Sequence, residues 1–206
     1  MYIVGAGSVG GHLAYNIETY IKDAEIVGFF DDDPGKVGSD MFGYPVLGPV
    51  DELVQLADVN VVFGIAFPKI KKGIVEKLSV NKTLLYPTLI HEKAWVSKGV
   101  TVGEGSIIYP GTTINYGCSV ASFVVMNMNC ALGHHTTVGN YTSFAPGVCT
   151  GGHTEIGDCV EMGVGASTIQ NVRIGDRSIV GGQSMVVKDV EKGSRMAGVP
   201  ARSMKE

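Results

Sequence analysis

A repeat of six residues runs through the second half of the chain and restricts its fold more than any other feature. From Ile90 to Val186 every sixth residue is apolar except Thr150 and Thr168, and no insertion breaks the register. A period of six fits neither an α-helix, which repeats every 3.6 residues, nor a single strand, which repeats every two. It is typical of a parallel β-helix, in which the first position of each hexad points inward. The fifth position carries small residues, so we expect the coil to turn there.

Composition and charge limit the function classes. The formal net charge is −4 and no cluster of Lys and Arg is present, so we expect no nucleic-acid partner. No apolar stretch approaches the roughly 20 residues of a membrane span, which predicts a cytoplasmic protein without membrane insertion. The four cysteines show neither metal spacing nor a disulfide framework, so we expect reduced packing residues at these positions: Cys118, Cys130, Cys149 and Cys159.

Residues 1–86 show a different pattern, in which short apolar runs alternate with helical segments. Such alternation predicts a small parallel sheet with crossover helices, which is a Rossmann-like α/β domain. The expected strands cover residues 2–4, 26–30, 59–65 and 83–86, and the expected helices cover 11–20, 50–56 and 69–78.

A glycine-rich loop lies between the first expected strand and the first expected helix. Residues 5–10 read GAGSVG, and Asp31 and Asp32 follow at the end of the second strand. Glycines let backbone N–H groups approach a diphosphate at the helix N-terminus, and a carboxylate at this distance commonly binds a ribose hydroxyl. The loop therefore predicts nucleotide binding. A domain of this length suits a mononucleotide diphosphate better than NAD.

The hexad register also predicts which side chains are neighbours in space. If three hexads form one coil, residues 18 apart stack at about 4.8 Å. His134 then lies between Tyr116 and Gly152, and His135 lies beneath His153. His135 and His153 suggest a metal site, but two ligands are too few for structural zinc and no Cys or Asp completes a set of four. We therefore expect no metal.

Several segments together resemble a known family. The Pro-Thr-Leu-Ile-His sequence at 87–91, the unbroken hexads, Lys-Asp-Val at 188–190 and Gly-Val-Pro-Ala-Arg at 198–202 resemble the sugar acetyltransferases of bacterial glycan biosynthesis. This family includes sialic acid O-acetyltransferases and N-acetyltransferases of UDP-linked 4-amino-4,6-dideoxy sugars. The resemblance implies a left-handed parallel β-helix with a C-terminal tail over 87–206, a homotrimer, and acetyl-CoA bound between neighbouring β-helices.

The resemblance also implies catalytic roles. His134 matches the family's general base, which removes a proton from the attacking amine or hydroxyl. The family places an acidic residue next to this histidine, whereas this chain has His135. The carboxylate then comes from Glu155, from Glu161 or from a neighbouring protomer, or the enzyme depends on it less. Gly152 matches a glycine whose backbone N–H faces the thioester carbonyl; its alternative role is that of a simple turn.

Further binding residues are implied in the same way. Cofactor contacts fall on Ser143, where many relatives have His, and on the main chain of Gly152, Val164 and Gly182. Residues 198–202 match a segment near the adenine. Substrate contacts fall on the following residues: Gly7, Ser8, Val9, Asp31, Asp32, Gly64 and Asn127. For Asn127 the alternative is a structural asparagine ladder along the coils.

The resulting functional prediction is an acetyl-CoA-dependent enzyme that acetylates the amine of a nucleotide-linked amino sugar in bacterial surface glycan or glycoprotein biosynthesis. Residues 1–86 hold the nucleotide sugar, and residues 87–206 hold acetyl-CoA and the base. Three alternatives stay open. They are O-acetylation of sialic acid or another sugar, a non-catalytic nucleotide-sensing trimer, and a small NAD-dependent enzyme.

Overall fold

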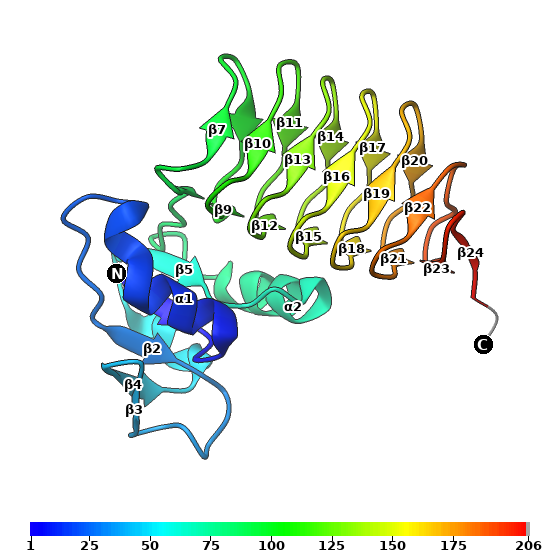
Figure 1. Cartoon of the computed structure of the whole chain (residues 1–206). Coiled ribbons are helices and arrows are strands. Elements are labelled where there is room, and N and C mark those ends of the chain that lie inside the picture. The colour runs from blue at the N-terminus through cyan, green and yellow to red at the C-terminus, as the bar shows by residue number, and fades with distance from the viewer. Residues whose placement is uncertain (205–206) are drawn as a thin grey trace. The chain divides into compact units, whose positions relative to one another are not determined.

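The computed structural model describes residues 1–204, which divide into two compact units (Figure 1). The first unit spans Met1–Leu89, and the second begins at Ile90. The sequence predicts the change of pattern at residue 86. No helix among residues 1–204 is both long and apolar enough to cross a membrane.

The first unit contains a five-stranded sheet with the order β3-β4-β2-β1-β5. The strands are β1 (Tyr2–Val4), β2 (Gly28–Phe30), β3 (Asp40–Met41), β4 (Tyr44–Gly48) and β5 (Val61–Phe63). Strands β2, β1 and β5 are almost entirely buried and run parallel, as the alternating pattern predicts. The sheet is nevertheless mixed, because β3 pairs antiparallel with β4.

The helices of this unit are α1 (Ser8–Asn16), η1 (Ile17–Thr19), η2 (Val50–Gln55) and α2 (Pro68–Leu78). The expected helix at 11–20 thus begins earlier, at Ser8 within the glycine-rich segment, and the one at 50–56 is a 3₁₀ helix. The expected strand at 83–86 is wrong, since only an isolated bridge joins Leu85 to Asn60. The β3–β4 hairpin was not predicted. Its turn places Phe42 and Gly43 at positive φ, which suits Gly but is rare for Phe.

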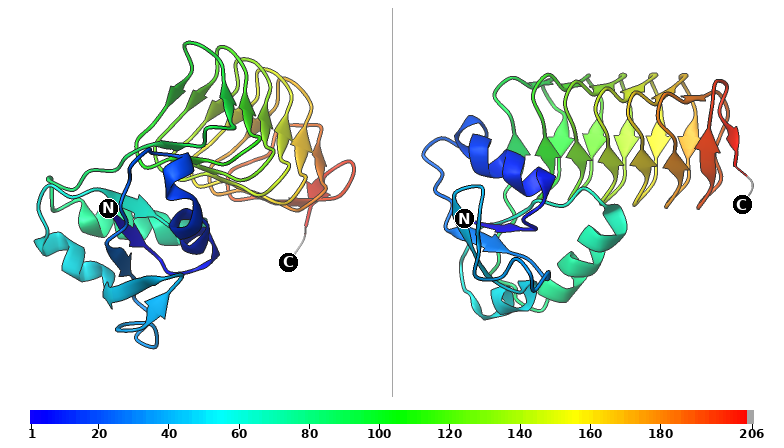
Figure 2. Two further views of the ribbon diagram at one scale, coloured as in Figure 1. Left: turned by 60° about the vertical axis from the view of Figure 1, so that its left-hand side comes forward. Right: turned by 60° about the horizontal axis from the view of Figure 1, so that its bottom comes forward.

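The second unit is a parallel β-helix built from three ladders of short strands, with three strands in each coil (Figure 2). The first ladder contains β7 (Trp95–Val96), β10 (Thr113–Ile114), β13 (Ala131–Leu132), β16 (Cys149–Thr150), β19 (Ser167–Thr168) and β22 (Met185–Val186). The second contains β8 (Thr101–Val102), β11 (Ser119–Val120), β14 (Thr137–Val138), β17 (Glu155–Ile156) and β20 (Arg173–Ile174). The third contains β6 (Leu89–Ile90), β9 (Ile107–Ile108), β12 (Val125–Met126), β15 (Ser143–Phe144), β18 (Glu161–Met162), β21 (Ile179–Val180), β23 (Arg195–Ala197) and β24 (Arg202–Ser203).

Strand pairing follows the predicted spacing of 18 residues. Thr113 pairs with Ala131, and Ala131 pairs with Cys149, in parallel register. Among the described strands of the second unit, only the last, β24, runs antiparallel to its neighbour β23. The register is consistent with the left-handed β-helix that the family resemblance implies.

The core of the β-helix takes two residues from each hexad. The first position is buried from Ile108 onward, as predicted. The fifth position is also fully buried, which corrects the expectation that the coil turns there. Its hydroxyls bond to backbone carbonyls of the next coil, as Thr112 Oγ1 does to Asn127 O at 3.0 Å. Thr150 is a polar residue at the first position, and its Oγ1 lies 3.2 Å from Thr136 Oγ1. The two buried hydroxyls are therefore hydrogen-bonded to each other.

The turns lie at the fourth position of the hexads, where φ is positive at every such position from Gly99 to Gln183. His135 and His153 occupy two of these positions, at φ 57° and 55°.

The cysteines are all free, but they differ in exposure. Cys118 and Cys130 occupy the buried fifth position as predicted, and burial raises the pKa of Cys130 to about 12. Cys149 is free as predicted but exposed, so the expectation that it packs in the interior is wrong, while Cys159 is half-buried.

Candidate active site

The glycine loop after β1 is held by close backbone packing. A Cβ at Gly10 would clash with the carbonyl oxygen of Gly5, and a Cβ at Gly64 would lie 2.6 Å from both Gly10 Cα and Gly5 O. These three glycines let the loop and the end of β5 approach each other. Gly7 is different, because a Cβ there would meet no atom within 4 Å. Its backbone is thus left uncovered at the N-terminus of α1.

A cavity of about 310 Å³ opens at this loop. It is lined by six of the seven predicted substrate residues: Gly7, Ser8, Val9, Asp31, Asp32 and Gly64. Phe67, Ile70 and Ile74 add an apolar wall. Uncovered backbone N–H groups at a helix N-terminus favour a phosphate, and the apolar wall suits a base or sugar ring.

Asp31 is largely occupied by the protein itself. Its Oδ2 accepts hydrogen bonds from the Ala6 N–H at 2.8 Å and from Lys36 at 3.0 Å, and its Oδ1 accepts one from the Asp33 N–H at 2.9 Å. Burial alone would raise the pKa of Asp31, but these hydrogen bonds outweigh it and lower the pKa. Asp32 likewise accepts the Val50 N–H at 2.8 Å. Asp31 therefore braces the glycine loop and Asp32 the start of η2, and a ribose contact stays a prediction.

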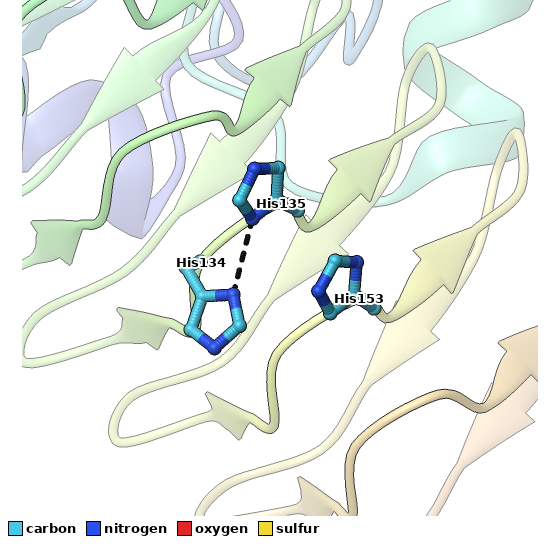
Figure 3. A group of neighbouring side chains, drawn as sticks. All are labelled: His134, His135 and His153. Atoms are coloured by element: carbon cyan, nitrogen blue, oxygen red, sulfur yellow. Dashed lines mark hydrogen bonds between the residues drawn. The ribbon is translucent and has the colours of Figure 1, made fainter.

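Three histidines gather at one corner of the β-helix (Figure 3). His134 and His135 lie between β13 and β14, and His153 lies one coil further on. His134 Nδ1 is 3.1 Å from His135 Nδ1. The rings of His135 and His153 stack with 4.7 Å between centroids and an interplanar angle of 3°. On its other side, His134 stacks on Tyr116 at 5.6 Å and 13°.

Gly152 lies directly over the other edge of the His134 ring. A Cβ at Gly152 would be 2.7 Å from both Nε2 and Cε1 of His134. Because Nδ1 faces His135, Nε2 is the nitrogen that faces this glycine. No protein acceptor within residues 1–204 bonds to the Gly152 N–H. A base nitrogen and a backbone donor thus share one corner, which is the arrangement that acyl transfer requires.

No carboxylate takes the place of the family's acidic residue within the described part of a single chain. Glu155 forms an ion pair with Arg173 at 2.9 Å. Glu161 belongs to the third ladder, where it pairs with Ser143 and Ile179 rather than with the histidine corner. His135 is the residue that contacts His134 Nδ1.

Apart from Gly152, the predicted cofactor residues lie elsewhere on the coil. Val164 lies between β18 and β19, and Gly182 lies one coil further along the same edge, which is not the edge of His134. Ser143 is on β15 and is 9% exposed. Asn127 Oδ1 accepts the N–H of Met128 at 2.8 Å, so its side chain closes a local turn and forms no ladder between coils.

The fold combines an N-terminal α/β domain with a hexapeptide-repeat β-helix that carries a histidine corner. Residues 1–78 match the family model of the PglD N-terminal domain. No match was found among curated proteins.

Solved structures are similar over almost the whole chain. The acetyltransferase domain of PglB from Neisseria gonorrhoeae is 26% identical, with 98% of each chain covered and a TM-score of 0.89. WeeI from Acinetobacter baumannii AYE is 27% identical, with the same coverage and TM-score. PerB from Caulobacter crescentus has the same fold at 24% identity, covering 99% of this chain and 96% of PerB, with a TM-score of 0.90. The predicted resemblance to the sugar acetyltransferases of the hexapeptide-repeat type is confirmed by these similarities.

Proposed function

We propose that this protein transfers an acetyl group from acetyl-CoA to the amine of a nucleotide-linked amino sugar. The observation that carries the proposal is His134, whose Nε2 faces Gly152 at an exposed corner of the β-helix. The related PglB domain has been crystallised with acetyl coenzyme A, and PerB with CoA and GDP-perosamine. The cavity at the glycine loop supports the first unit as the site of the nucleotide sugar.

The chemistry assigns separate tasks to His134 and Gly152. The amine attacks the thioester carbonyl, and His134 Nε2 takes the amine proton as the C–N bond forms. The Gly152 N–H donates to the oxyanion of the tetrahedral intermediate. The C–S bond then breaks, and the imidazolium returns the proton to the CoA thiolate. Cys118 and Cys130 are buried, which supports direct transfer without a covalent acyl-enzyme at these thiols.

His135 fixes the tautomer of the base. A neutral imidazole has one lone pair and one N–H. For Nε2 of His134 to accept a proton, its hydrogen must be on Nδ1, and His135 Nδ1 at 3.1 Å is the acceptor for that hydrogen. His135 is therefore a positioning residue that replaces the family's acid.

The active unit is proposed to be a cytoplasmic homotrimer. His134 and Gly152 lie on one edge of the coil, and Val164 and Gly182 lie on another. One acetyl-CoA molecule contacts both sets of residues when it lies between two copies of the chain. Equilibrium sedimentation tests the trimer, and a monomer at micromolar concentration contradicts it.

An acceptor panel tests the function. The protein is incubated with acetyl-CoA and either GDP-, UDP- or dTDP-linked 4-amino sugars or free sialic acid, and the acetylated product is identified by mass spectrometry. We expect an N-acetylated nucleotide sugar. Turnover of sialic acid alone contradicts N-acetylation, and absence of product with every acceptor contradicts an enzyme of this kind. A rise in Tm with NAD, but with no sugar nucleotide, identifies the NAD alternative.

A further inference from the structure

The histidine corner offers more nitrogen ligands than acetyl transfer requires. General base catalysis uses His134 and one partner, yet His153 contacts both rings, with 5.0 Å between the centroids of His134 and His153. The spacing of 18 residues in the sequence identifies only His135 and His153 as potential metal ligands. The structure adds His134 as a third. We propose that His134, His135 and His153 bind a divalent transition-metal ion, and that the bound ion blocks acetyl transfer.

The spacing of the three imidazoles suits such an ion. One ligand nitrogen from each ring lies within 4.8 Å of the others. With metal–nitrogen bonds of about 2.0–2.1 Å, two nitrogens of a tetrahedral site are about 3.3 Å apart. His134 Nδ1 and His135 Nδ1, at 3.1 Å, are already at this spacing. The His135 and His153 side chains are exposed, so rotation of the His153 ring brings in the third nitrogen without moving the coil.

The fold itself does not demand histidine at these positions. His135 and His153 have positive φ, a conformation in which His is enriched. Other coils place Phe123, Asn171 and Arg177 at the same hexad position with similar φ. Because the turn accepts such different side chains, its geometry does not explain why two adjacent coils both carry histidine.

The surroundings leave room for a fourth ligand. A polar cavity of about 350 Å³ adjoins His153 and is also lined by Glu155, Asn171, Arg173 and Asp189. Three protein nitrogens with solvent in the fourth position form an open site. Imidazole ligands favour Zn²⁺, Cu²⁺, Ni²⁺ or Co²⁺ over Mg²⁺ and Ca²⁺, which prefer oxygen.

The inhibition by a bound metal rests on the proposed function. It follows because a neutral imidazole has a single nitrogen lone pair. A metal on His134 Nδ1 uses the lone pair of the neutral imidazole, so the remaining hydrogen must be on Nε2. Nε2 then has no lone pair with which to accept the amine proton. Metal binding and base catalysis at His134 therefore exclude each other, and inhibition is reversed when the metal is removed.

A direct titration tests the site independently of activity. Full-length protein without a histidine tag is treated with EDTA, dialysed and titrated with Co²⁺, whose visible absorption reports tetrahedral nitrogen coordination. Zn²⁺ is then added to displace the Co²⁺. We expect one ion per chain, and we expect His153→Asn, which keeps a side chain suited to positive φ, to weaken binding at least about tenfold. His12→Asn is the matched control, because His12 lies outside the cluster, bonded to Tyr20, and should leave Kd unchanged.

The activity assay then tests inhibition. Acetylated sugar is measured by mass spectrometry with saturating Co²⁺, before and after EDTA, because the thiol of product CoA interferes with Zn²⁺. We expect wild-type turnover to fall at least tenfold with Co²⁺ and to return with EDTA, whereas His153→Asn stays active at the same concentration. No cobalt spectrum, or equal Kd for wild type and His153→Asn, overturns the metal site. Binding without loss of turnover overturns the inhibition. A protein that binds Co²⁺ but acetylates no acceptor refutes the proposed function and leaves the metal site standing.

Discussion

Gly152→Ala is the substitution that most directly tests the geometry of the His134 base. The new methyl group would lie 2.7 Å from Nε2 and Cε1 of His134. Carbon contacts are normally about 3.5–4.0 Å, so the ring must move by roughly 1 Å. Gly152 does not have positive φ, so alanine adds no backbone strain, and the backbone N–H remains. The substitution therefore displaces the base while keeping the oxyanion donor.

The expected magnitude follows from that displacement. A misplacement of about 1 Å in a catalytic geometry costs up to 10²-fold in rate. We expect kcat to fall about 10- to 10²-fold, which corresponds to about 1.4–2.7 kcal/mol of transition-state stabilisation. Stability should change little, because the atoms that must move are the end of a half-buried side chain.

Steady-state kinetics with acetyl-CoA and the preferred acceptor, together with Tm, measure both effects. A double-mutant cycle with His134→Ala provides the control. Once the imidazole is absent, Gly152→Ala has nothing to displace and should cause no further loss of kcat. Wild-type kcat in Gly152→Ala, or fully additive losses in the double mutant, would refute the reasoning.

Three further predictions concern the base, the core and the glycine loop. His134→Ala should lower kcat by about 10²–10⁴ with Tm unchanged, and a near-normal rate removes His134 from the mechanism. Thr142→Val leaves the Gly157 carbonyl and the Val160 N–H without the hydroxyl bonds of 2.8 and 3.0 Å, so urea unfolding should show a loss of about 1–3 kcal/mol that Thr142→Ser avoids. The folded pKa of Asp31 lies below its unfolded value, so its stabilisation is present above the unfolded pKa and is lost as pH falls through the folded pKa. Asp31→Asn should therefore be less stable than wild type at pH 7, with the difference disappearing in acid; a difference independent of pH contradicts this account.

The hexad register was sufficient to predict most of the β-helix. From β6 to β22 stacked strands are 18 residues apart because each coil has three strands and no insertion changes its length, so strand pairing could be counted from the sequence. Beyond the last hexad the spacing shortens, and Ile179 pairs with Arg195. The burial of the side chains at the fifth position could not be predicted in the same way. Threonine and serine there look like surface turn residues, and only the carbonyls of the next coil make their burial favourable.

The first unit was harder to predict because its strands are short and its turns depend on single residues. The buried runs that form β1, β2 and β5 were found from their apolar pattern. The hairpin at 40–48 was missed, because β4 contains Pro45 and has no strong apolar alternation. The expected strand at 83–86 has apolar residues, but only Leu85 forms a bridge. Close packing accounts for glycine at positions 5, 10 and 64, where a Cβ would clash, whereas nucleotide binding at the loop stays a prediction.

The histidine corner shows where counting along the sequence reaches its limit. A register assigns residues to columns, and it placed His134 beneath Gly152 and His135 beneath His153. It treats the two columns as separate, although neighbouring residues at a tight turn direct their side chains to the same region. The ring of His134 is parallel to Tyr116 in its own column, and its Nδ1 contacts His135 in the next. His134 is therefore shared between a base site, which uses Nε2, and a three-histidine cluster, which uses Nδ1. Because a neutral imidazole has one lone pair, these two uses cannot operate together.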